Sequence, residues 1–499
     1  MSTLETKPID QKVTKAFPEN GKPTFVSNVS KIIGAAAFGQ VLGIISLPII
    51  TRLFAPEAFG LLGLYTAIIG IIGVFVCMRY ELAIVLPKDD NDAANLIWAS
   101  IAFTLFWTLL AGLATIFFRN NIASLINAPE IAPFLWLVPI GIFLTGIHTA
   151  FSHWNTRRAQ FGRLARVSIA TSIVITLSKL SMGFGGLVSG GALIISSLIG
   201  TITGSYLLIT KIWKIDRHYL ISKISINRIR FLINQYSNIS IFNSTSSLFI
   251  SLSQHAPLIL LAYFFSPVIV GYYLLANKLL KIPVNLIGNS VRKVYFQRAS
   301  DEWNKTGNLT KLTLNVTTIL SVISIGAMTI FISLIAPIAA IIFGVEWNVA
   351  GKYMQWIALA TGVTFICNPI SIVSIILRKE NIVLYYQFYG FILRITALLM
   401  GGIVFVDPYI SIILYSIAGM LYQLTFLNWI LKKTELSLMI LIKKVYFYLF
   451  LSTIVVIICL MCLYYDISLY IIISIVFIYS IIYTISSKSL WSPWFKNIF

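Results

Sequence analysis

Two lysines one helical turn apart are the side chains in this sequence most suited to binding an anion. Lys278 and Lys281 lie within an apolar run long enough to cross a membrane. Residues three apart lie on the same face of a helix, so the two ammonium groups would point the same way. A cation near the middle of a membrane costs about 2.5–3.5 kcal/mol on insertion scales, and such residues are usually functional. Two neighbouring cations suit a diphosphate better than a neutral molecule.

Two further cations interrupt apolar runs. Lys179 and Arg394 lie near the middle of their runs, at equivalent places in the two halves of the chain. Glu81 is the acid nearest to the interior of a run, beside Arg79 in the segment CMRYELAIVLP. Because no acid accompanies the cations, we expect an anionic ligand or the water of a cleft to compensate their charge. The alternative is that the side chains snorkel to the membrane surface or meet carbonyl groups.

The other polar features are weaker. Gln254 and His255 are adjacent within an apolar run, and we expect them to face the same cleft. The acidic run KDDNDAAN begins at residue 88, and we interpret it as a solvated loop whose Asp92 caps the next helix. The four cysteines lie in apolar runs and are interpreted as small buried hydrophobes, including the pair Cys459 and Cys462. We find no catalytic constellation, and we expect no metal and no cofactor.

The elements that must position these residues are predicted to be membrane-spanning helices. Of the 499 residues, 58% are apolar and 11% are charged, whereas soluble domains average about 25% charged residues. A spanning helix needs about 20 apolar residues. Runs of this kind predict an all-α polytopic membrane protein with fourteen transmembrane helices, at approximately 28–51, 58–82, 94–118, 132–152, 165–186, 189–211, 239–264, 268–290, 312–342, 350–377, 382–405, 408–431, 445–465 and 467–487.

The placement of Lys and Arg predicts the orientation of these helices. With the N-terminus inside, the inner segments hold 30 of the 37 basic residues, and the outer segments hold only Arg52, Arg119 and Lys352. Cytoplasmic loops of membrane proteins collect Lys and Arg. We therefore expect both termini in the cytoplasm, and we attribute the net charge of +20 to topology and not to nucleic-acid binding.

One short turn occurs twice in the chain. The segments FAPEAFG (54–60) and FSPVIVG (265–271) share a Phe, a small residue, a Pro, three further residues and a Gly. They join spans one to two and seven to eight. Six spans separate them, so the halves would insert in the same orientation, as two parallel six-helix lobes around a central cavity. Chance recurrence of Pro and Gly between membrane helices is the alternative.

These patterns divide the chain into six predicted segments. They are a cytoplasmic N-terminal tail (1–27), an N-lobe of spans one to six (28–211), a cytoplasmic linker (212–238), a C-lobe of spans seven to twelve (239–431), spans thirteen and fourteen (432–487) and a cytoplasmic C-terminal tail (488–499). The last two spans lie outside the repeat. Both a lipid-facing role and a groove for a long apolar chain are compatible with their composition.

Several stretches between about residues 28 and 430 resemble a known family. LPIITRLFAPEAFGLLGLY, RYELAIVLPKDDNDAANL, WNTRRAQFGRLARVS, GYYLLANKLLKIPVNLIGNSVRKVYF and FGVEWNVAGKYMQW resemble the Wzx-type O-antigen and polysaccharide flippases. These form the polysaccharide-export branch of the multidrug/oligosaccharidyl-lipid/polysaccharide (MOP) superfamily. The match beyond about residue 430 is poor.

The resemblance implies a V-shaped cavity lined mainly by helices one, two, seven and eight. It implies that an undecaprenyl-diphosphate-linked oligosaccharide crosses from the cytoplasmic to the periplasmic leaflet of the bacterial inner membrane by alternating access. It also implies a place in lipopolysaccharide and O-antigen biosynthesis, beside a polysaccharide polymerase and chain-length machinery. Cavity cations of the family are thought to serve the anionic carrier, and the matching residues here are Arg52, Arg79 and Lys278.

The sequence therefore predicts a substrate-binding set and one coupling residue. The predicted coupling residue is Glu81, and the driving ion is left open between a proton and sodium. The predicted substrate-binding residues are Arg52, Arg79, Lys278, Lys281, Gln254, His255, Lys179 and Arg394.

Two alternative functions would require other features of the sequence. A cation-coupled drug exporter of the same superfamily would need a carboxylate deep in the first lobe, where only Glu81 is available. A polysaccharide polymerase or glycosyltransferase would need acidic residues and large loops on the outer side. The outer acids are isolated, which argues against an enzyme; they are Glu57, Glu130, Glu346, Asp407 and Asp466.

Overall fold

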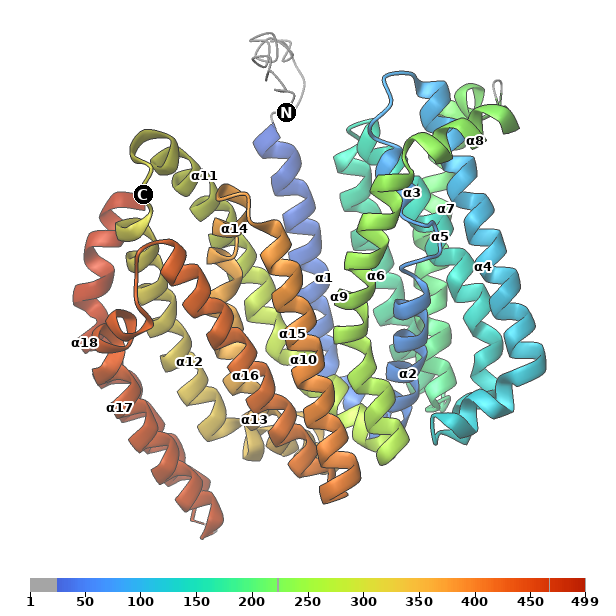
Figure 1. The fold of residues 1–499 in the computed structure, drawn as a ribbon. Coiled ribbons are helices and arrows are strands. Elements are labelled where there is room, and N and C mark those ends of the chain that lie inside the picture. The colour runs from blue at the N-terminus through green and yellow to red at the C-terminus, as the bar shows by residue number, and fades with distance from the viewer. Residues whose placement is uncertain (1–24, 222–223, 466, 499) are drawn as a thin grey trace.

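The computed structural model describes residues 25–221, 224–465 and 467–498. Within these ranges the chain is helical and contains no strand. Figure 1 shows one bundle of long helices, with the two ends of the chain at the same end of the bundle. The predicted all-α polytopic architecture is confirmed. Most of the predicted N-terminal tail lies outside the described residues.

The first half of the chain forms the N-lobe. Its elements are α1 (Phe25–Leu53), α2 (Pro56–Ile72), α3 (Tyr80–Ala83), α4 (Asp90–Leu125), η2 (Pro129–Trp136), α5 (Leu137–Arg157), α6 (Phe161–Phe184) and α7 (Gly190–Ile221). Proline opens both α2 and η2, where its missing N–H group costs nothing. Helix α7 continues to Ile221, well into the predicted linker.

The second half begins with a short helix and forms the C-lobe. Its elements are α8 (Ile226–Gln235), α9 (Ser237–Phe264), α10 (Pro267–Pro283), η3 (Val284–Gly288), α11 (Asn289–Thr306), α12 (Thr310–Phe343), η4 (Val345–Trp347), α13 (Asn348–Ile370), α14 (Val373–Ile376), α15 (Glu380–Leu399), η5 (Met400–Phe405) and α16 (Pro408–Lys433). Two final helices, α17 (Leu438–Tyr464) and α18 (Leu469–Ile498), pack against α12 on the flank of the bundle (Figure 1). Helix α18 extends through most of the predicted C-terminal tail.

The helices match the fourteen predicted spans in position but not in every length. Among the described residues, twelve helices are long and apolar enough to cross a membrane. The other two predicted spans contain α2 and α10, which have 17 residues each. These are the two helices that follow the repeated turn. By length and composition, twelve of the fourteen predicted transmembrane helices are therefore supported, and α2 and α10 are too short to decide.

The second predicted span is broken. Helix α2 ends at Ile72, and turns carry the chain to Tyr80. Met78 and Arg79 adopt the left-handed backbone conformation, with φ of 48° and 59°, which non-glycine residues seldom adopt. The Ser240 hydroxyl on α9 donates a hydrogen bond to the Met78 carbonyl and holds the break from outside. The prediction of one helix over 58–82 is therefore wrong, and Glu81 lies in the separate helix α3.

The acidic loop before α4 also differs from its prediction. Asp89, and not Asp92, is the cap of α4, because its side chain accepts a hydrogen bond from the backbone N–H of Asn91. Asp92 instead forms an ion pair with Arg228 on α8, with both oxygen–nitrogen distances at 2.7 Å. This pair ties the helix between the lobes to the N-lobe.

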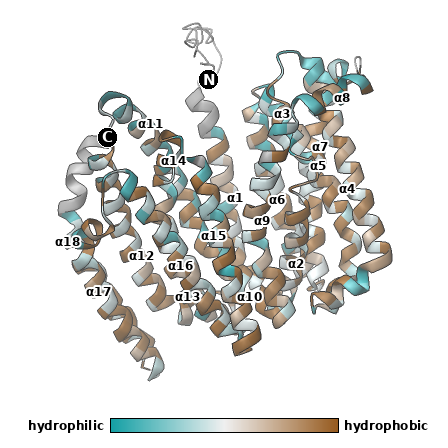
Figure 2. Ribbon diagram, in the orientation of Figure 1, coloured by the Kyte–Doolittle hydropathy of each residue, from teal (hydrophilic) through white to brown (hydrophobic). Residues whose placement is uncertain are grey.

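The surface of the bundle follows the membrane pattern. Figure 2 shows apolar residues along the sides of the long helices and hydrophilic residues gathered at the end that carries the chain termini. Inside, one apolar cluster is shared by both lobes and includes Phe54, Leu64, Val270 and Trp347. We call the end of the bundle opposite the termini the distal end.

The repeated turns meet each other at the distal end. Helices α2 and α10 pack together along their length. A Cβ atom on Gly60 would collide with the carbonyl group of Pro267, and one on Gly271 would collide with the carbonyl group of Pro56. Each glycine therefore lets the backbone of one lobe touch the backbone of the other. This reciprocal contact supports the interpretation of the repeat as two related lobes.

Candidate functional site

A cavity of about 560 Å³ lies between the lobes. Its walls come from α1, α2 and α6 of the N-lobe and from α10 with η3 of the C-lobe. On α1 the lining includes Ala36, Gly39 and Gly43, whose spacing puts small residues on one face of the helix. These small side chains keep the α1 wall open.

Three of the four mid-span cations line this cavity. Lys278 and Lys281 of α10 are exposed, and Lys179 of α6 is partly exposed. Lys179 and Lys278 lie close enough for their charges to act on each other. No Asp or Glu lines the cavity, and none of the three lysines belongs to an ion pair in the described part of the chain. The cavity therefore presents uncompensated positive charge.

Neutral polar side chains surround the lysines, and sequence analysis did not identify them. The polar lining residues are Gln40, Ser46, Thr66, Ser172, Thr176 and Asn285. The side-chain oxygen of Gln40 has no hydrogen-bond partner among the described residues. In the sequence, Gln40 is distinguished only as an amide side chain between two glycines of the apolar run GAAAFGQVLG. Amides and hydroxyls of this kind can bind sugar hydroxyl groups through hydrogen bonds.

Arg394, the fourth cation, lies outside the cavity lining. Its guanidinium stacks on the ring of Tyr422 at 4.9 Å, and its Nε atom has no hydrogen-bond partner among the described residues. Its charge acts on Lys281. Beside this lysine, the Tyr273 hydroxyl donates to the Tyr415 hydroxyl at 3.1 Å. Arg394 thus adds positive charge behind the cavity wall, within the C-lobe.

Arg52 lies at the distal end and bridges the lobes. Its guanidinium Nη2 donates to the carbonyl of Ile341 on α12 at 2.8 Å. Beside it, the buried indole of Trp347 donates to the carbonyl of Thr51 at 2.9 Å. The Trp347 ring also packs against Phe59 of α2, with centroids 4.9 Å apart. Arg52 is therefore not among the residues that line the cavity, and its contacts help to close the distal end.

Arg79 and Glu81 form a pair at the break in span two. Arg79 Nη1 lies 3.5 Å from Glu81 Oε1, and the Glu81 residue is 4% exposed. The second Glu81 oxygen has no hydrogen-bond partner among the described residues. Neither residue lines the cavity.

Gln254 and His255 also lie outside the cavity lining. Gln254 is exposed. The His255 ring lies against Gly70 of α2, where a Cβ atom would collide with it. The wall that the family resemblance assigned to span seven is formed instead by α6, while helices one, two and eight take their expected places. No comparison with a bound ligand tests the predicted roles, which stay predictions.

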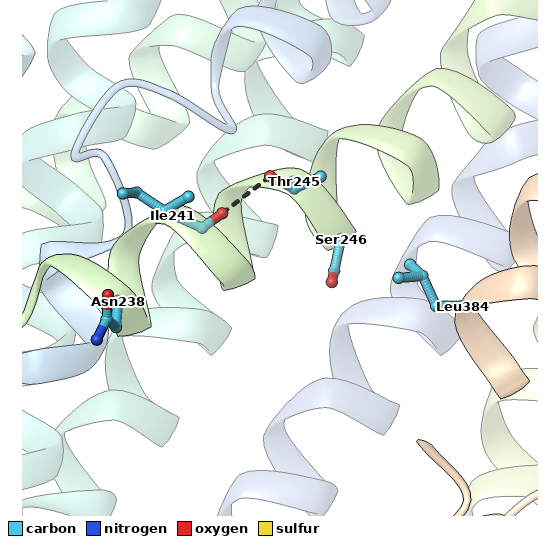
Figure 3. Close-up of a pocket in the computed structure, with 5 residues that line it drawn as sticks. All are labelled: Asn238, Ile241, Thr245, Ser246 and Leu384. Carbon is cyan, nitrogen blue, oxygen red and sulfur yellow. Dashed lines mark hydrogen bonds between the residues drawn. The ribbon is translucent and has the colours of Figure 1, made fainter. Parts of the chain in front are cut away.

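A second pocket lies within the C-lobe, nearer the chain termini. It measures about 410 Å³ and lies between the first half of α9 and the start of α15. Figure 3 shows Ser246 of α9 and Leu384 of α15 on the facing helices. This pocket is therefore distinct from the inter-lobe cavity and from the α2–α10 contacts at the distal end.

The chain matches a family model described as polysaccharide biosynthesis protein over residues 49–352. It belongs to this family. A relative of known role is the succinoglycan biosynthesis transport protein ExoT of Rhizobium meliloti (strain 1021), which is 22% identical over 338 residues. This match covers 66% of the chain and 64% of the relative, so the chain spans less than two thirds of the length of ExoT.

Solved structures show which fold this polysaccharide biosynthesis protein has. The inward closed conformation of the lipid II flippase MurJ matches with a TM-score of 0.70 at 16% identity, covering 91% of the chain and 98% of MurJ. An inward-facing multidrug resistance transporter of the MATE family, in the MOP superfamily, matches with a TM-score of 0.62 at 14% identity, covering 81% of the chain and 98% of that protein. The fold is that of the MOP superfamily, as the sequence predicted.

Proposed function

We propose that this polysaccharide biosynthesis protein is a flippase for an oligosaccharide linked through a diphosphate to undecaprenol. The observation that carries the proposal is the convergence of Lys179, Lys278 and Lys281 on one inter-lobe cavity, to whose lining the described part of the chain contributes no acid. A diphosphate entering this cavity gains charge-assisted hydrogen bonds from ammonium groups. It also neutralises charges that repel one another in the empty cavity.

The neutral lining suits the rest of such a substrate. Six amide and hydroxyl side chains share the cavity with the lysines, and sugar hydroxyl groups need donors and acceptors of this kind. A cationic drug would be repelled by the same three lysines, so the cavity argues against the drug-exporter alternative. The relatives support the proposal: one is a succinoglycan biosynthesis transport protein and another is a lipid II flippase.

The contacts at the distal end support alternating access. Closure there rests on the reciprocal glycine–proline contacts and on the hydrogen bonds from Arg52 and Trp347. A hydrogen bond contributes about 0.5–1.5 kcal/mol to a folded state, so a small difference in ligand affinity between two states can shift this equilibrium. The lobes would rock about the cavity, opening the distal end as the other end closes.

We place the distal end on the periplasmic side, because the basic residues concentrate at the opposite end. The protein then lies in the bacterial inner membrane, with both termini in the cytoplasm. A lipid-linked repeat unit would enter from the cytoplasmic leaflet and leave toward a polysaccharide polymerase and its chain-length machinery. Glu81, buried with one oxygen unpaired among the described residues, is the proposed coupling residue.

The test is a deletion of the gene in its host. Without the flippase, lipid-linked repeat units should accumulate on the cytoplasmic leaflet and surface polysaccharide should disappear, and a plasmid copy should restore both. The control is a deletion of the polysaccharide polymerase, in which repeat units should reach the periplasmic leaflet. Repeat units on the periplasmic leaflet of the flippase deletion strain would refute the proposal.

A further inference from the structure

Four consecutive helices of the N-lobe each carry a buried polar atom without a hydrogen-bond partner. The atoms are Thr108 Oγ1 on α4, His148 Nδ1 on α5, Thr171 Oγ1 on α6 and Ser205 Oγ on α7, and none has a partner within the described ranges. Each residue lies near the middle of its helix. A buried polar group left unpaired costs about 1–3 kcal/mol. Unpaired polar atoms near the middle of four neighbouring helices therefore suggest that a bound group supplies the missing hydrogen bonds.

Most of the neighbouring hydroxyl groups on these helices do have a hydrogen-bond partner. Thr104, Thr145, Thr149, Thr201 and Thr203 each donate to the carbonyl four residues earlier, at 2.7–3.0 Å. This bond is the usual one for a hydroxyl within a helix. Thr171 and Ser205 could make the same bond but do not.

Two of the four atoms, on α5 and α6, meet beside Gly204 of α7. A Cβ atom at this position would lie 2.8 Å from Thr171 Oγ1 and 3.3 Å from His148 Nδ1. The two polar atoms are therefore no more than about 6 Å apart, a separation that one water molecule can bridge. Ser205 follows in the chain and is 4% exposed. A side chain at position 204 would therefore crowd the two polar atoms that α5 and α6 present to α7.

We propose that His148, Thr171 and Ser205 form a hydrated proton-binding site within the N-lobe, in which His148 takes up the proton. Imidazole is the side chain whose charge changes between about pH 5 and 8. A proton from water binds at Nδ1 and returns to water when it leaves. The two hydroxyl groups hold the bridging water, which typically makes about three hydrogen bonds when buried. This site is separate from the lysine cavity and from Glu81.

The charged and titratable groups that face α5 lie away from this space. Cys77 contacts α5 two residues before His148, because its thiol lies 3.6 Å from the Gly146 carbonyl. Lys179 lies two turns along α6 from Thr171 and lines the inter-lobe cavity. The others contact the ends of α5. Tyr65 contacts Leu137, Asp90 contacts Arg157, Arg163 of α6 contacts Asn155, and Asp216 contacts Trp154 and Arg158. The arginine of the Arg79–Glu81 pair acts on His153.

The test uses the full chain in lipid nanodiscs with ¹⁵N-labelled histidine. The sequence has four histidines, so His148→Gln assigns the signal by its disappearance. We expect the His148 signal to titrate reversibly within about pH 5–8 and to show an exchange cross-peak with water. The double variant Thr171→Val/Ser205→Ala should lose this cross-peak and shift the titration midpoint.

Thr149→Val is the matched control, because it removes a hydroxyl one residue from His148 that is already bonded to Thr145. It should leave the cross-peak and the midpoint unchanged. A His148 signal that keeps one protonation state over the whole range would overturn the proposal, as would a double variant that titrates like the wild type. The measurement needs no transport, so a failed flippase assay beside an intact titration would count against the proposed function alone.

Discussion

Removing the ammonium group of Lys278 is the sharpest perturbation of the proposed cavity. Lys278→Ala deletes one of the three cations that line it and leaves Lys281 one turn away on α10. No acid of the described ranges lines the cavity, so the change leaves no partner charge unpaired. We therefore expect normal protein levels in the membrane, since losing a mid-span cation eases insertion, together with a strong loss of surface polysaccharide.

The size of the loss follows from the contact that disappears. A hydrogen bond to a charged group contributes about 1.5–3 kcal/mol, and each 1.4 kcal/mol corresponds to about a factor of ten. A single contact is therefore worth about 10- to 100-fold in the rate at limiting substrate. Because Lys278 is exposed to the cavity, solvent screening favours the lower part of that range. Lys278→Arg keeps the charge and should stay within a few-fold of the wild type.

The assay compares these variants in the deletion strain and in liposomes that contain a lipid diphosphate oligosaccharide. Lys433→Ala is the matched control, because Lys433 is an exposed lysine at the end of α16 and outside the cavity. Normal polysaccharide in the double variant Lys278→Ala/Lys281→Ala would refute the reasoning. The lysines would then only snorkel, and the anion site would lie elsewhere.

Four further predictions concern the rest of the molecule. Gly271→Ala should force the distal contact apart at a cost of about 1–3 kcal/mol and reduce transport, whereas Gly112→Ala, with open space around it, should have little effect. Trp347→Phe keeps an aromatic ring but loses the hydrogen bond to α1, and it should increase the labelling, by a membrane-impermeant thiol reagent, of a cysteine introduced into the cavity lining. Glu81→Gln should abolish the dependence of transport on pH, and unchanged transport between pH 6 and 8 would contradict its coupling role. A reporter fused near Arg119 should report the periplasm, and a cytoplasmic signal there would overturn the predicted topology.

The helices could be predicted because their signal is local. Runs of apolar residues placed helices over all fourteen predicted positions, and the repeated turn marked the two helices, α2 and α10, that the structure packs against each other. That Lys179 and Lys278 line the same cavity was harder to predict from the sequence, because it depends on α6 forming a wall of the cavity opposite α10 of the other lobe. A mid-span charge shows that a cleft is needed, but it does not show which helices form the cleft.

The misplaced residues have a physical explanation of their own. Arg52 lies just before the repeated turn, in the last turn of α1. Its depth in the membrane could be predicted, but its long side chain reaches across the lobes to a carbonyl instead of into the cavity. The break begins at Gly73, a glycine within an apolar run of the kind that membrane helices often contain. The left-handed residues themselves, Met78 and Arg79, are not glycines, so their conformation had no signal in the sequence. That conformation is stabilised by a contact from α9, which lies 162 residues away in the chain.

The repeat explains the shape of the cavity, and departures from the repeat explain its charge. Superposing the two turns aligns Gly271 with Gly60, which places Lys278 at the position of Ala67 and Lys281 at the position of Gly70. In α2 both positions are small: Ala67 is fully buried, and Gly70 accommodates the ring of His255. In α10 the same positions carry cations that line the cavity. An anion between the lobes would therefore bind chiefly to α10, so it would move with the C-lobe when the distal contacts open.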